Sequence, residues 1–154
     1  FIISKRVASM LSKYLSPQTI RLQVPVNDWK EAVEVGGGLL VETGKCEPRY
    51  VEAMVRAVQD LGPYMVLAPG LSLAHARPED GALAVGLSIV TLSTPVNFGS
   101  EANDPVKLVI SFCGIDHDSH IEMLKALAEF LMVDENQNLL NSSNSVEEIL
   151  QAFQ

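Results

Sequence analysis

The stretch PYMVLAPGLSLAHARPEDG at residues 63–81 is the most informative part of the chain for both its fold and its chemistry. An apolar run ends in Pro69-Gly70, a dipeptide typical of turns, and a second short apolar run leads to His75 at the start of a polar loop. We therefore expect two short strands, one on each side of the turn. A histidine held at a strand end, with acidic and basic groups within five residues, suits reversible proton or phosphoryl chemistry near neutral pH.

Outside this stretch, strand-like and helix-like patterns alternate along the chain. Strands are predicted at 19–26, 64–68, 71–74, 84–93 and 106–112. Helices are predicted at 29–43, from Pro48 to the Gly62-Pro63 stop, from a cap at Asp118 or Ser119 to Met132, and at 146–153. The run 106–112 is nearly continuously apolar, as expected of a central strand buried on both faces. The pattern predicts one α/β domain with a central mixed β-sheet flanked by helices.

Composition limits the possible partners and surroundings. The chain has 154 residues, of which 47% are hydrophobic, and no apolar run approaches the roughly 20 residues that span a bilayer. The formal net charge of −8 argues against nucleic acid and favours a basic protein surface as partner. Cys46 and Cys113 lack the spacing of a metal or redox motif, so we expect free thiols in a reducing, cytoplasmic compartment. No cofactor is expected.

Residues 1–9 are basic, in contrast to the acidic remainder. We expect them to be a linker or an appended sequence, with Met10 as the natural start and the domain at residues 10–154.

The surroundings of His75 favour phosphoryl chemistry. Ala74 and Ala76 are small and leave room for a partner to approach, and Pro78 stiffens the loop. Arg77 supplies a planar guanidinium of the kind that pairs with phosphate oxygens. The alternative is that His75 is structural or merely exposed.

His120 is expected in the first turn of its helix, where free backbone N–H groups and the positive end of the helix dipole favour an anion. The alternative is that it only covers the helix start. Two histidines with a nearby carboxylate, Asp116, could also bind zinc, although His117-x-x-His120 has no recognised metal-motif context.

Several segments of the chain resemble those of a known protein family. The segments Gly62-Pro63-Tyr64, Ala68-Pro69-Gly70 and His75–Gly81 resemble the IIA phosphocarrier domain of bacterial sugar phosphotransferase systems (PTS), in the mannitol/fructose superfamily and closest to its ascorbate-type branch. Further segments agree in order, namely Asp28–Ala32, Tyr50–Met54, Asn103–Val106 and His120-x-x-x-Leu124. The resemblance covers roughly residues 20–153 and implies a single IIA mannitol/fructose-like domain.

The resemblance also implies a mechanism. His75 would accept a phosphoryl group from the phosphorylated carrier protein HPr and pass it to a cysteine of a IIB component, which serves the membrane permease IIC. The second histidine of the family corresponds to His120, which would hydrogen-bond the phosphoryl group or orient His75.

One position departs from the mannitol and fructose branches, which usually carry an arginine where this chain has Ala57. Arg56 stands one residue earlier, and one residue rotates a helical side chain by about 100°, so Arg56 is not assumed to face the site. We therefore expect Arg77 to neutralise the phosphate. This departure agrees with the ascorbate-type branch.

Two alternatives to a transport phosphocarrier stay open. One is a regulatory relative that controls a transcription factor or kinase through phosphorylation of His75. The other is a small metal-dependent hydrolase that uses His75, His120 and Asp116.

The docking surface around His75 is expected to be shallow and rimmed by apolar side chains, with Leu71, Leu73 or Phe98 as contacts. The sugar and the oligomeric state stay open.

Overall fold

The Pro69-Gly70 turn joins two antiparallel strands, β2 (Val66–Ala68) and β3 (Leu71–Ala74), in the computed structural model, which describes residues 5–154. Gly70 has a φ of 75°, a left-handed conformation that glycine adopts without steric cost. The hairpin predicted from the central stretch is therefore confirmed, and it places His75 immediately after β3.

The other predicted elements are present with shifted ends. They are β1 (Ile20–Val24), β4 (Gly86–Val96), β5 (Val106–Cys113), α2 (Trp29–Glu42), α3 (Pro48–Leu61), α4 (His117–Leu131) and α6 (Val146–Ala152). Elements that the sequence patterns did not indicate are α1 (Lys5–Ser12), α5 (Asp134–Ser142) and two short 3-10 helices, η1 (Pro17–Thr19) and η2 (Pro78–Asp80).

The strands of the described residues form one mixed sheet in the order β1-β4-β5-β3-β2. The β1–β4 and β3–β5 pairs are parallel, whereas β4–β5 and β2–β3 are antiparallel. β5 lies at the centre and its residues are almost all buried, which explains the continuous apolar run at 106–112. The predicted α/β fold with a central mixed sheet is confirmed.

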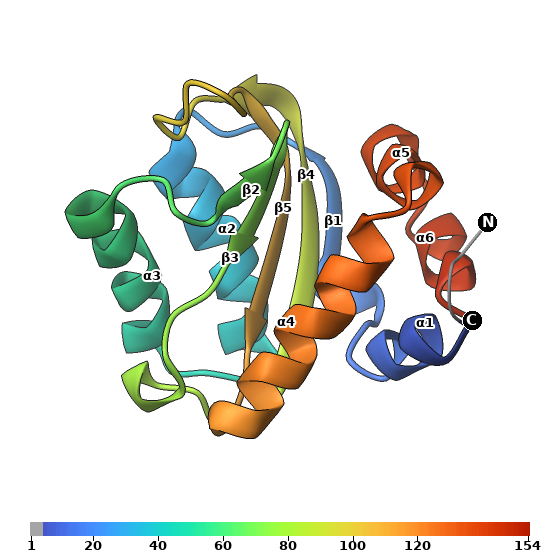
Figure 1. Cartoon of the computed structure of the whole chain (residues 1–154), viewed down its shortest axis with the longest axis horizontal. Helices are drawn as coiled ribbons and strands as arrows, with labels where there is room; N and C mark the ends of the chain where they lie inside the picture. Colours follow the sequence, from blue (N-terminus) through green and yellow to red (C-terminus); the bar gives the residue numbers. More distant parts are fainter. Residues whose placement is uncertain (1–4) are drawn as a thin grey trace.

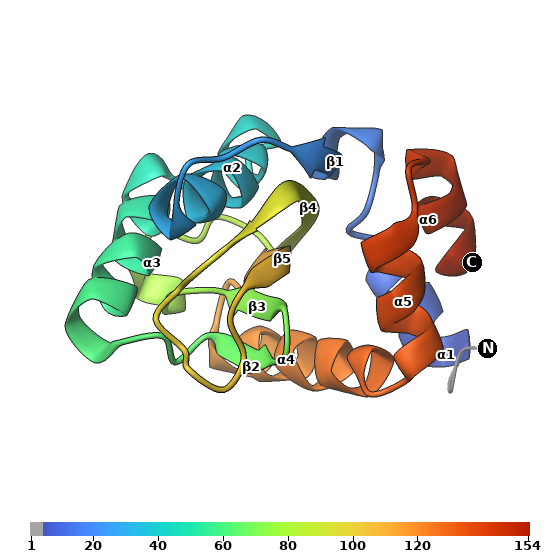
Figure 2. The ribbon, with the colours of Figure 1, turned by 90° about the horizontal axis from the view of Figure 1, so that it is seen from above.

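Helices cover both faces of the sheet. α2 and α3 pack on one face, and α4 lies on the other with α1, α5 and α6 (Figures 1 and 2). Alternate residues of β5 serve the two cores: Leu108, Ile110 and Phe112 face the α4 side, while Val109 and Cys113 face α2 and α3. Successive side chains of β5 therefore point to opposite faces of the sheet, and this one apolar strand contributes to both hydrophobic cores.

The start of α4 differs from the prediction. Its N-cap is Asp116, not Asp118 or Ser119, because Asp116 and Ser119 cap each other. Asp116 Oδ1 accepts the Ser119 N–H at 2.8 Å, and Ser119 Oγ accepts the Asp116 N–H at 3.1 Å. The helix thus begins at His117, and His120 still lies in its first turn.

The N-terminal segment contributes to the core. Within α1, Val7, Ala8 and Leu11 are buried in the cluster that includes α4 residues. Residues 5–9 therefore pack as part of the domain's helical layer, while residues 1–4 of the predicted linker lie outside the described residues. The origin of residues 1–9 stays a prediction.

Two further expectations concern the thiols and the membrane. Cys46 and Cys113 are both buried and are free thiols, as predicted. No helix within residues 5–154 has both the length and the apolar character to cross a bilayer.

Candidate active site

The parallel strands β3 and β5 end at the same edge of the sheet, and α4 begins there. His75 follows β3 directly, and His120 comes from the first turn of α4. Their imidazole ring centroids are 5.5 Å apart, with an interplanar angle of 61°. Two histidines that are distant in the sequence therefore share one site, as predicted.

Phe112, at the end of β5, forms an apolar base under both histidines. Its ring is stacked on His75 with centroids 5.0 Å apart and is tilted against His120 at 5.3 Å. Phe112 is fully buried. The sequence analysis placed it only as the last residue of a buried strand, and that position at the strand end was the available signal.

The hydrogen bonding of His75 identifies its tautomer. Nδ1 lies 2.8 Å from the carbonyl oxygen of Leu73. Because a carbonyl can only accept, Nδ1 carries the proton and Nε2 keeps a free lone pair. The pKa of His75 is lowered, mainly by burial. The hydrogen bond to Leu73 opposes this effect in part, and nearby His120 adds a smaller lowering. His75 is therefore neutral at pH 7, which is the nucleophilic form of imidazole.

His120 is also held in the neutral form. Its Nδ1 is buried and has no hydrogen-bond partner among the described residues, so a proton on that nitrogen would be an unpaired buried donor. Burial and the neighbouring His117 lower the pKa of His120, while Glu79 opposes them. The neutral tautomer with the proton on Nε2 is therefore favoured, and His120 can donate one hydrogen bond.

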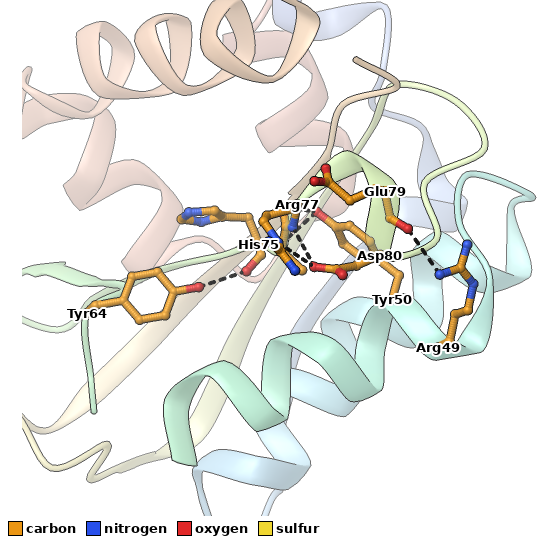
Figure 3. A network of polar contacts seen from close by, with 8 residues as sticks. Arg49, Tyr50, Tyr64, His75, Arg77, Glu79 and Asp80 are labelled. Carbon is orange, nitrogen blue, oxygen red and sulfur yellow. Dashed lines mark hydrogen bonds and ion pairs between the residues drawn. The ribbon is translucent and has the colours of Figure 1, made fainter. Parts of the chain in front are cut away.

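Tyr64 holds the backbone of His75 from the outer side. Its hydroxyl donates to the His75 carbonyl at 3.1 Å, and the two rings meet edge to face with centroids 5.7 Å apart (Figure 3). Burial, with a contribution from Asp80, raises the pKa of Tyr64, so the hydroxyl keeps its proton. The sequence analysis used Tyr64 only as part of the family-like segment.

Arg77 is exposed and tied to its own loop. Its Nε lies 3.5 Å from Asp80 Oδ2, and its backbone N–H donates to the same oxygen at 3.0 Å (Figure 3). The guanidinium also borders the surface beside His75. The structure thus brings Arg77 to the site while pairing it with a carboxylate.

Two open depressions flank the histidines. The first, of about 510 Å³, includes His75, Tyr64, Leu61 and Arg56 in its lining, so Arg56 does reach the site despite its shifted position on α3. The second, of about 690 Å³, is lined by residues of η2 and the start of α4, including Ile115 and His117. Arg77 and His120 line both depressions.

The apolar rim differs from the prediction. Leu71, Leu73 and Phe98 are each less than 5% exposed and lie within the two hydrophobic cores. Leu71 and Leu73 belong to β3, whose two faces are covered by helices, and Phe98 lies in the loop after β4, where it packs near Trp29 of α2. The exposed apolar side chains beside the histidines are instead Leu61 and Tyr64 in the first depression and Ile115 in the second, and these were not predicted.

The described part of the chain does not bring a set of metal ligands together. Within residues 5–154, no group of three or more His, Cys, Asp or Glu side chains is placed to hold a metal ion. Asp116, the carboxylate of the hydrolase alternative, is engaged as the helix cap, and its hydrogen bonds with Ser119 lower its pKa. The arrangement of residues supports group transfer on a neutral histidine better than metal-assisted hydrolysis.

Comparison with known proteins shows which family the chain belongs to. Residues 13–154 match the family described as phosphoenolpyruvate-dependent sugar phosphotransferase system, EIIA 2. The chain is 39% identical to the ascorbate-specific PTS system EIIA component of Salmonella choleraesuis over 133 residues, or 86% of each protein.

Two solved structures extend the likeness to the fold. The mannitol-specific cryptic phosphotransferase enzyme IIA CmtB of Escherichia coli has a TM-score of 0.85 and 33% identity, covering 93% of this chain and 97% of that one. The complex of IIAMTL with phosphorylated IIBMTL from Escherichia coli contains a chain with a TM-score of 0.79 and 28% identity, covering 90% of this chain and 96% of that one. By this match and this identity, the chain belongs to the EIIA 2 family and is a phosphoryl-transfer component of the sugar phosphotransferase system.

Proposed function

We propose that the chain carries its phosphoryl group on Nε2 of His75, accepting it from phospho-HPr and passing it to the cysteine of an ascorbate-type IIB component. The observation that carries this proposal is the 2.8 Å contact between His75 Nδ1 and the Leu73 carbonyl. It leaves Nε2 as the nitrogen with a free lone pair.

The transfer step follows from this tautomer. Nε2 attacks the phosphorus as the bond to the donor's histidine nitrogen breaks, so one N–P bond forms and one is lost. The imidazole becomes positively charged while it keeps its proton on Nδ1. The Leu73 carbonyl accepts from that proton and stabilises the developing charge. In the second step, the cysteine sulfur of IIB takes the phosphoryl group and His75 returns to its neutral form.

Stabilisation of the phosphoryl oxygens is assigned to His120 and Arg77. The ring separation of 5.5 Å supports the role of His120, because the His120 Nε2–H would donate to a phosphoryl oxygen on the neighbouring His75. Arg77 would exchange its long contact with Asp80 for the more highly charged phosphoryl group. Arg56, on the wall of the first depression, is a second guanidinium that could serve the same purpose.

The proposed partners are HPr and IIB, which would dock in turn over the two depressions, with the IIC permease served indirectly. Exposed Leu61 lines the first depression and exposed Ile115 lines the second, so each offers a partner an apolar contact. The likeness to IIAMTL, solved in complex with phosphorylated IIBMTL, supports the IIB partner. Identity to ascorbate-specific components supports the ascorbate-type system, and a cytoplasmic location accords with these partners. A regulatory role stays a separate prediction, because no feature of residues 5–154 favours it.

The test is incubation with phosphoenolpyruvate, enzyme I and HPr, followed by mapping of phosphohistidine. The wild type should be labelled on His75, His75→Ala should gain no label, and His120→Ala should gain label more slowly. Met132→Ala, which removes an exposed side chain that lines neither depression, serves as the control and should be labelled normally. Label that persists on His75→Ala would contradict the proposal.

A further inference from the structure

The hydroxyl of Tyr50 lies between the ends of two strands. Tyr50 belongs to the first turn of α3 and is fully buried. Its hydroxyl accepts the Ala76 N–H at 2.9 Å and donates to the Phe112 carbonyl at 2.9 Å, with the Ala76 carbonyl also within reach at 3.1 Å. Figure 3 shows the Tyr50 side chain extending from the helix toward the loop that follows His75.

The position of this hydroxyl corresponds to a missing rung of the sheet. β3 and β5 are paired in parallel as far as Ala74 and Ser111. The Leu108 N–H donates to the Gly70 carbonyl at 3.0 Å. Together with the register, this bond determines which N–H and carbonyl groups of the two strands pair further along the parallel ladder. In that phase the next rung beyond Ala74 would join the Ala76 N–H directly to the Phe112 carbonyl. The Tyr50 hydroxyl bonds to both of these groups and replaces that rung.

We infer that Tyr50 is a positioning residue for phosphoryl transfer: its hydroxyl, inserted between the ends of β3 and β5, holds His75 in place over Phe112. The inference rests on the proposed role of His75. Ala76 adjoins His75 in the chain, and Phe112 carries the ring that stacks on His75 and contacts His120. One buried hydroxyl thus holds the backbone next to His75, at Ala76, and the backbone of Phe112, whose ring stacks on His75.

The hydroxyl is suited to this task at any working pH. Burial raises the pKa of Tyr50, so the group remains both a donor and an acceptor. Without it, the Ala76 N–H and the Phe112 carbonyl would either stay unpaired in the interior or close directly on each other. Direct closure would draw the strand ends together and shift the His75 ring relative to Phe112.

The effect of the hydroxyl is separable from attachment of α3. The loop that contains η2 is also held by the Glu47 N–H, which donates to the Gly81 carbonyl at 2.8 Å, and by Arg49 Nη1, which donates to the Glu79 carbonyl at 3.1 Å. A Tyr50→Phe variant keeps these bonds and the buried ring. The variant therefore tests the inserted hydroxyl and not the docking of the helix.

The experiment compares Tyr50→Phe with Ser88→Ala in transfer from phospho-HPr. Ser88 is the matched control, because its buried hydroxyl also joins the sheet to a helix: it donates from β4 to the Gly36 carbonyl of α2 at 2.9 Å. For Tyr50→Phe we expect the rate at saturating phospho-HPr to fall at least about tenfold, with the half-saturating concentration changed less than about twofold. The His75 ring signals in ¹H–¹⁵N spectra, and the pKa they report, should also shift. Ser88→Ala should show neither change.

Two results would overturn the inference. One is a Tyr50→Phe protein with wild-type transfer kinetics and unshifted His75 ring signals. The other needs no variant: wild-type spectra in which no slowly exchanging Tyr50 hydroxyl proton shows a cross-peak to the Ala76 amide proton. Wild type that gains no label on His75 would instead contradict the proposed function, so the two failures are distinguishable.

Discussion

Gly114 packs directly against the first turn of α4 at His120. A Cβ on residue 114 would stand 2.6 Å from both Cα and the backbone nitrogen of His120. Only glycine lets the chain leave β5 and bring α4 this close to the sheet edge. The closeness of the two histidines thus depends on a residue that carries no side chain.

Gly114→Ala should therefore displace the start of α4 and move His120 away from His75. Overpacking of this kind costs about 1–3 kcal/mol of unfolding free energy, and we expect transfer from phospho-HPr to slow as well. Chemical unfolding and transfer kinetics measure the two effects. Gly38→Ala is the control, because a Cβ there meets nothing within 4 Å inside α2; it should raise stability by about 0.5–1 kcal/mol and leave transfer unchanged. Normal transfer in Gly114→Ala would show that the close approach is not needed.

The pKa of His75 predicts how transfer depends on pH. Burial lowers this pKa, so the neutral nucleophile persists below the ordinary histidine value of about 6.5. Transfer from phospho-HPr should stay level as the pH falls through that value and decline only at lower pH. A decline centred at or above 6.5 would contradict a buried, neutral His75.

Stability should show the same linkage with a definite sign. The unfolded chain binds a proton on residue 75 more readily than the folded one, so unfolding free energy falls as the pH drops below about 6.5. His75→Gln removes this contribution and should lose less stability than wild type between neutral and mildly acidic pH. Equal losses in urea titrations of both proteins would argue against a lowered pKa.

Removal of the Arg77 guanidinium should slow transfer with little effect on folding. A charge-assisted hydrogen bond to phosphate is worth roughly 1.5–3 kcal/mol, so Arg77→Ala should reduce the transfer rate by about one to two orders of magnitude. Its contact with Asp80 is long and exposed, which contributes at most about 1 kcal/mol to stability. Arg56→Ala, assayed in parallel, reports whether the other guanidinium serves the phosphoryl group. Wild-type kinetics in Arg77→Ala would remove it from the mechanism.

Docking should depend on the apolar side chains beside the site. Leu61 is 73% exposed and lines the first depression, whereas Met132 is 76% exposed and lines neither depression. Leu61→Glu should raise the half-saturating concentration of phospho-HPr several-fold without lowering the saturated rate. Met132→Glu adds the same charge elsewhere and should leave both quantities unchanged. Equal effects of the two substitutions would mean that net charge, and not this surface, governs docking.

The strand and helix patterns near the site could be predicted because they are local. The Pro69-Gly70 turn and the apolar run at 106–112 fix the β2–β3 hairpin and the central strand. α5 could not be predicted in this way, because its sequence DENQNLLNS is mostly polar and has no helical stripe of apolar residues. Asn136 Nδ2 donates to the Phe130 carbonyl at 2.9 Å and Gln137 Nε2 to the Leu131 carbonyl at 2.7 Å, at the end of α4.

The same distinction applies to the site. His75 and His120 stand out in the sequence by residue type and position, and the family resemblance paired them. Tyr50 belongs to a segment that resembles the family, but its role could not be predicted, because its hydroxyl bonds to Ala76 and Phe112, which are 26 and 62 positions away. The predicted apolar rim was wrong for a related reason. Which face of a short strand is exposed depends on the helices that cover it, and those lie far away in the sequence.

The most direct test of the account is to identify the phosphorylated nitrogen. The protein, labelled with ¹⁵N in its histidines, is phosphorylated through phosphoenolpyruvate, enzyme I and HPr, and its ring nitrogens are observed by NMR. We expect the phosphorus coupling on Nε2 of His75, with the Nδ1 proton retained and hydrogen-bonded to the Leu73 carbonyl. A phosphoryl group on Nδ1 of His75, or on His120, would contradict it.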